Sequence, residues 1–133
     1  MGLQELNGVL WDERDLLEDL LFALRTEQWV IGEGHSRWVG RAGSRVEELN
    51  DSLRLTEVLR AAESAAVAAE LGLGPVPSLT ELAESAGEPW RTMFLEQRAG
   101  LLAAADDIAA VTADTARPGL TAPAWAAPGE GAS

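Results

Sequence analysis

Few side chains in this sequence could perform chemistry, and histidine is the first to consider. His35 is the only histidine and follows the glycine-rich stretch Gly32–Gly34. A metal site or a nucleophile–base pair needs further ligands or partners, and no such set surrounds His35. The chain has no cysteine, so it forms neither a disulfide nor a thiolate metal site. We interpret His35 as a turn residue.

Carboxylates are abundant, but their spacing does not indicate a catalytic pair. They gather in the segments 12–19 and 47–51, where arginines are interleaved with them. Pairs three and four positions apart on solvated helix faces explain such clusters. Asp106 and Asp107 are adjacent, and neighbouring helix positions point about 100° apart. The sequence also lacks a Walker motif, a phosphate-binding glycine loop and a nucleophile elbow. These patterns predict a protein that is not an enzyme and uses no cofactor or metal.

One local basic feature stands out in an acidic chain. Arg37, Arg41 and Arg45 follow each other at intervals of four, which places them in one row on a helix. The row could meet an acidic partner segment, or it could pair with the acidic first helix of the same chain. We favour the intramolecular pairing, because such pairs are the more common.

The overall charge limits the classes of partner. The chain has 133 residues, 22 acidic and 10 basic, and a formal charge of -12. Phosphate backbones and anionic lipids repel such a surface, so nucleic acid is not the expected partner. No apolar run approaches the roughly 18 residues that span a bilayer, and the first residues do not resemble a secretory signal. The composition predicts a soluble cytoplasmic protein.

The spacing of apolar residues predicts an all-α fold that begins with a long helix. A stripe with steps of three and four runs through residues 3–32, and its members are Leu3, Leu6, Leu10, Leu17, Leu20, Leu24 and Ile31. Glu13 and Glu27 occupy the two gaps in it. A helix of thirty residues is about 45 Å long, which suits an elongated antiparallel bundle or coiled coil.

A second long helix is predicted over residues 36–71, with Ser36 as its N-cap. Its first stripe contains Val39, Ala42, Val46, Leu49 and Leu53. Beyond Leu53 the apolar pattern shifts by two residues and continues through Leu55, Leu59, Ala62, Ala66 and Ala69. We expect this shift to rotate the packing face, so that the two ends of the helix contact different neighbours.

The stretch LGLGPVPSLTELA at 71–83, which we call the elbow, interrupts the long helices. Gly72 is placed to end the second helix, and Ser78 with Glu81 fits a capping box that starts a short helix closed by Gly87. Pro89 then begins a C-terminal helix over 89–115. We predict one helical domain over 1–115, followed by a disordered Pro/Ala/Gly-rich tail over 116–133 that contains Trp125.

The order of these segments resembles the FlgN family of flagellar type III export chaperones, in the form found in actinobacteria. The similarity covers about residues 5–113 and includes ERDLLEDLLFALRTEQ, GHSRW, the elbow with EPW after it, and LEQRAGLLAAADDIA. The elbow followed by EPW is its most specific part. One departure is TADTARPGL, where relatives often have asparagines.

The resemblance implies a cytoplasmic, non-catalytic chaperone. It would bind hook-associated proteins of the hook–filament junction (FlgK and FlgL type), keep them soluble and deliver them to the export apparatus, as a monomer or a homodimer. In the family the C-terminal helical region binds the cargo. Here the implied cargo stripe is Met93, Phe94, Leu95, Leu101, Leu102, Ile108 and Val111.

Two other classes remain open. Trp38-Val39-Gly40 reads W-x-G between two long helices, which resembles the small helical-hairpin proteins secreted by type VII systems. The chain is longer than such a hairpin, and its lack of tyrosine removes the expected secretion motif. A generic helical adaptor is the other alternative.

Overall fold

The fold is all-α, as predicted, in a computed structural model that describes residues 2–115. The helices are α1 (Gly2–Gly32), α2 (Ser36–Leu71), α3 (Leu79–Ala86) and α4 (Trp90–Thr115). No strand occurs among these residues. The predicted tail over 116–133, with Trp125, lies outside the described residues, so the predicted domain boundary at 115 stays a prediction.

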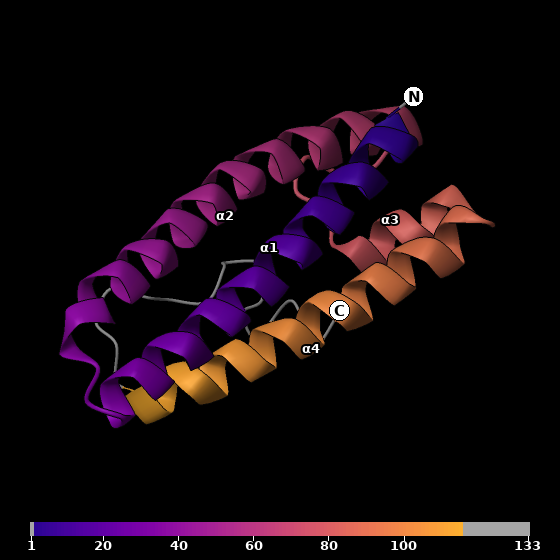
Figure 1. The fold of residues 1–133 in the computed structure, drawn as a ribbon. Coiled ribbons are helices and arrows are strands. Elements are labelled where there is room, and N and C mark those ends of the chain that lie inside the picture. Colours follow the sequence, from indigo (N-terminus) through magenta and orange to yellow (C-terminus); the bar gives the residue numbers. More distant parts are fainter. Residues whose placement is uncertain (1, 116–133) are drawn as a thin grey trace.

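The helices form an elongated bundle around α1 (Figure 1). α1 and α2 make an antiparallel hairpin, and α4 runs parallel to α1 on the side away from α2. The short α3 packs on α4 near the C-terminal end of α2. At 1.5 Å per residue, the 31 residues of α1 span about 46 Å and the 36 residues of α2 about 54 Å.

Apolar stripes from all four helices converge on one core. The largest fully buried side chain is Phe94 of α4, and α1 supplies a row of leucines beside it. The core is completed by Leu6, Leu10, Leu17, Leu20, Ala23 and Leu24 of α1, Val46, Leu49, Leu53 and Val67 of α2, Leu79, Leu82 and Ala83 of α3, and Leu101, Ala104, Ile108 and Val111 of α4. Such burial is the main favourable term in the stability of the fold.

The helix ends follow the capping signals in the sequence, with one exception. Gly72 ends α2 in the left-handed region, at a φ of 74°. The capping box at α3 is present: Glu81 N donates to Ser78 Oγ at 3.1 Å, and Ser78 N donates to Glu81 Oε1 at 3.0 Å. The exception is Ser36, which lies inside α2 because His35 occupies the N-cap position and makes no side-chain cap there.

A carboxylate outside the capping box also stabilises a helix start. Glu88 precedes α4 and accepts hydrogen bonds from Thr92 N at 2.9 Å and Thr92 Oγ1 at 2.8 Å. These bonds favour the ionised carboxyl group and hold the pKa of Glu88 below its usual value. The start of α4 therefore lies within about one turn of Ala86, where α3 ends.

The core also contains charged side chains in the gaps of the first stripe. Glu13 is fully buried, and its Oε1 lies 3.9 Å from Nε of Arg60 on α2. The Arg60 side chain is itself only 13% exposed. Glu27 is 5% exposed. A buried carboxylate without a compensating charge costs free energy of folding. Arg60 supplies such a charge in the α1–α2 interface.

The predicted rotation of the α2 packing face is wrong. The core face of α2 continues in register from Val46, Leu49 and Leu53 to Thr56, which is 9% exposed, and to Arg60. It continues in α2 to Ser64 and Val67, which are buried as well. Polar side chains take these interface positions, and the Arg60 guanidinium lies beside the Glu13 carboxylate. The apolar residues of the shifted pattern therefore point away from the core.

Candidate partner-binding surfaces

The implied cargo stripe on α4 is largely part of the core. Phe94 and Leu101 are fully buried, Ile108 is 6% exposed and Val111 3% exposed. Its other members, Met93, Leu95 and Leu102, are half-buried along the edges of the helix. In this conformation four of the seven residues cannot contact another protein, and α4 would have to leave α1 to present them.

Polar contacts also fix α4 against α1. Arg14 Nη1 donates to Gln97 Oε1 at 3.1 Å, and Gln97 Nε2 donates to Asn7 Oδ1 at 3.3 Å. Gln97 is 2% exposed, so these bonds lie inside the interface. The guanidinium of Arg14 rests on Gly100, where a Cβ would lie 2.5 Å from its central carbon. These contacts set the register of the two helices and argue for a docked α4.

An exposed apolar seam runs along the outer face of α2, opposite α1. Leu55 is 69% exposed, Val58 67% and Leu59 57%. Three exposed alanines continue the line, so the outer seam consists of Leu55, Val58, Leu59, Ala62, Ala66 and Ala69. The residues at 55, 59, 62, 66 and 69 recur at alternating steps of four and three over about 21 Å of helix. A partner helix can bury a stripe with this spacing. No other described helix covers this face.

The hairpin end of α1 and α2 carries an aromatic cluster. The His35 ring contacts two indoles, with its centroid 5.0 Å from that of Trp29 and 5.0 Å from that of Trp38. Trp29 is 54% exposed and Trp38 41% exposed. The guanidinium carbon of Arg37 lies 5.5 Å from the centroid of Trp38. Residue spacing does not indicate this cluster, because its members come from the end of one helix, the turn and the start of the next.

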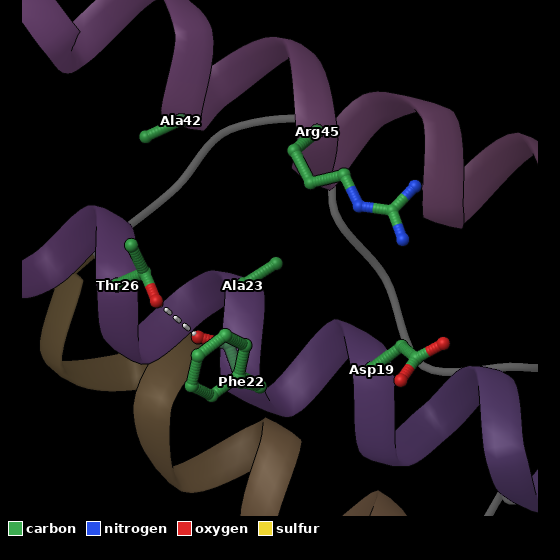
Figure 2. Close-up of a pocket in the computed structure, with 6 residues that line it drawn as sticks. All are labelled: Asp19, Phe22, Ala23, Thr26, Ala42 and Arg45. Carbon is green, nitrogen blue, oxygen red and sulfur yellow. Dashed lines mark hydrogen bonds between the residues drawn. The ribbon is translucent and has the colours of Figure 1, made fainter.

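Two adjoining pockets extend from this cluster along the α1–α2 interface, and we call them together the hairpin groove. The pocket beside the indoles has a volume of about 360 Å³ and is lined by Thr26, Trp29, Val30, Trp38, Arg41, Ala42 and Arg45. The second, of about 210 Å³, is lined by Asp19, Phe22, Ala23, Thr26, Ala42 and Arg45. Figure 2 shows Ala23 and Thr26 on α1 across from Ala42 and Arg45 on α2, with Thr26 Oγ1 donating to the Phe22 carbonyl oxygen at 2.9 Å.

The arginine row does not form the intramolecular pairs that we expected. Within residues 2–115, neither Arg41 nor Arg45 has a carboxylate oxygen within 4 Å, although α1 is acidic and adjacent. Both are exposed side chains on the wall of the hairpin groove. The alternative left open by the sequence, an acidic partner, stays a prediction.

Other sequence features have structural positions without a chemical arrangement. No group of three or more His, Asp or Glu side chains that could hold a metal ion occurs in the described part of the chain. Asp106 and Asp107 are both exposed. The Trp38-Val39-Gly40 motif lies within the first turns of α2, and the turn itself is 33–35. In residues 2–115, no helix is long and apolar enough to cross a membrane.

The chain was compared with protein-family models, curated proteins and solved structures, and none of the three comparisons finds a match. Its class is therefore defined by the fold itself: an all-α bundle with a central helix, a well-packed core and two exposed apolar surfaces.

Proposed function

We propose that this protein is a non-catalytic flagellar export chaperone that binds hook-associated proteins in the cytoplasm. The outer seam of α2 is the observation that carries the proposal. Monomeric proteins rarely expose an ordered line of large apolar side chains, and such surfaces mark sites of protein interaction. The resemblance to the FlgN family supplies the identity of the cargo, and the bundle is compatible with that role.

The seam is suited to a helical segment of the cargo. Leu55 and Leu59 offer large side chains at one end, while Ala62, Ala66 and Ala69 allow a second helix to approach closely at the other. A cargo segment that is disordered alone would fold on the seam as an amphipathic helix. The conformational entropy that the cargo segment loses when it folds lowers the affinity, and a moderate affinity permits release to the export apparatus. The charge of -12 would keep the complex soluble.

Isothermal titration calorimetry with a purified hook–filament junction protein tests the proposal. The wild-type protein should bind, and the double variant Val58→Glu with Leu59→Glu should bind at least about tenfold more weakly, because each carboxylate would be buried against an apolar cargo helix. Both positions are exposed and glutamate is a good helix former, so circular dichroism should show an unchanged fold.

Val76→Glu is the matched control. Val76 is 91% exposed but lies in the elbow between α2 and α3, outside the seam. Its substitution should leave the affinity unchanged. Failure of the wild type to bind either kind of junction protein would contradict the chaperone function. Full affinity of the folded double variant would contradict only the location of the cargo site.

A further inference from the structure

The hairpin groove differs from the outer seam, because it combines an apolar pocket with cationic side chains. The outer seam offers only apolar side chains, whereas the groove places Arg41 and Arg45 beside Trp29 and Trp38. We propose that the hairpin groove is a second binding site, which takes an acidic peptide segment carrying one large apolar side chain. This second site is separate from the outer seam, and the proposal for it does not depend on cargo binding at the outer seam.

The apolar part of the groove is arranged before any ligand binds. The His35 ring contacts both indoles in tilted geometry, at interplanar angles of 36° to Trp29 and 38° to Trp38, and both indoles line the pocket. Ala42 and Val30 line the same pocket with short side chains. A volume of about 360 Å³ lies within the range of small ligand pockets and accommodates one aromatic or branched aliphatic side chain. A preformed site loses less entropy when it binds.

Charge selects an acidic ligand. Arg41 and Arg45 are one turn apart on α2, about 6 Å along the axis, and neither is paired with a carboxylate of the described chain. They therefore offer free guanidinium groups to carboxylates of similar spacing, such as two glutamates four positions apart on a helix. Asp19, at the far end, is the one carboxylate among the lining residues of the two pockets.

The local charge matters because the rest of the molecule is acidic. A chain with a formal charge of -12 repels acidic peptides in general. Binding of such a peptide would therefore be confined to the surface where arginines outnumber carboxylates. Exposed charges are screened by salt, so the affinity should fall as the ionic strength rises.

Fluorescence anisotropy with a synthetic peptide tests the site on the full chain. The probe is a fluorescein-labelled alanine-based helix with two glutamates four positions apart and one phenylalanine between them. Two control peptides replace the glutamates by glutamine or the phenylalanine by alanine. The probe should bind, and each control peptide should bind at least about tenfold more weakly, because each lacks one of the two components of recognition.

Variants of the protein separate charge from shape. Arg41→Glu and Arg45→Glu should each weaken binding of the probe by about tenfold or more. Arg54→Glu, an equal change of charge on the opposite side of α2, should have no effect on affinity. Ala42→Leu keeps both arginines and fills the pocket. It should therefore lower the affinity for the probe as much as replacing the phenylalanine of the probe by alanine does. Equal binding by wild type and the two groove arginine variants would overturn the proposal.

Two other occupants give distinct results. If a second copy of the chain fills the groove, sedimentation will show a dimer that Arg45→Glu dissociates. If the residues after Thr115 fill it, a variant that ends at Thr115 will bind the probe at least about tenfold more tightly than the full chain does. Either result would overturn the assignment to a separate acidic partner. A monomer whose affinity is the same with and without residues 116–133 supports it.

Discussion

The buried charges show how single residues decide the packing of this bundle. Glu13 occupies a core position of α1 and is fully buried, and Arg60 lies across the interface on α2 at 3.9 Å between Oε1 and Nε. Glu13 fills a gap in the predicted apolar stripe and points into the core. Its partner was not predictable, because nothing in the spacing of α2 indicates which of its arginines faces α1.

Removal of Arg60 should therefore destabilise the fold strongly. Arg60→Ala leaves the Glu13 carboxylate buried without this counter-charge, and loss of one partner of a buried pair typically costs about 3–5 kcal/mol. Urea denaturation followed by circular dichroism measures the change. Arg54→Ala is the control, since the Arg54–Asp51 pair has side chains that are 64% and 71% exposed, and its removal should leave the midpoint nearly unchanged. Equal midpoints for the two variants would show that Arg60 does not stabilise Glu13.

At the scale of the helices, the boundaries were predictable and one packing face was not. The four observed helices begin and end within about two residues of the predicted ranges, because glycine stops, the capping box and Pro89 are local signals. The face of α2 depends instead on α1. Hydrophobic periodicity assigns Leu55 and Leu59 to the core, but Thr56, Arg60 and Ser64 take the interface positions, where Arg60 lies beside the buried Glu13.

Ser64 is a buried polar residue on the core face of α2, and it differs from Arg60 in its contacts. Its side chain lies in the continued core face, is 7% exposed, and its Oγ has no hydrogen-bond partner within the described residues. A buried hydroxyl without a partner costs free energy, so Ser64→Ala should raise the free energy of unfolding. The exposed Ser44→Ala on the same helix isolates the gain from helix propensity alone. We expect Ser64→Ala to exceed this control by about 1 kcal/mol in urea denaturation. A loss of stability would mean that the hydroxyl makes a bond that the interface needs.

The candidate site was predictable to a smaller extent than the fold. The row of Arg37, Arg41 and Arg45 was recognised from its spacing, but its expected pairing with α1 does not form. The α4 stripe was recognised as apolar, yet periodicity alone cannot tell a stripe buried by its own chain from one kept for a partner. That distinction depends on where α4 lies, and the elbow and α3 place it along α1.

For the molecule as a whole, two modes of cargo binding can be distinguished. In the first, α4 remains docked and the cargo helix lies on the outer seam of α2, on the other side of the bundle (Figure 1). In the second, α4 leaves α1 and presents Phe94, Leu101, Ile108 and Val111, which are buried in the free protein. The second mode would expose the leucine row of α1 as well, so it has the larger cost in buried apolar area.

Hydrogen exchange with mass spectrometry separates the two modes. We expect addition of a hook–filament junction protein to slow exchange of the amides of residues 55–70 and to leave α4 as protected as in the free chain. This follows because the seam is already exposed, whereas undocking α4 breaks the Arg14–Gln97–Asn7 bonds and opens the core. The variant with Val58→Glu and Leu59→Glu is the matched control and should show no slowing at 55–70. Faster exchange along α1 and α4 on binding, with no change in α2, would instead assign the cargo to the α4 stripe and refute the seam.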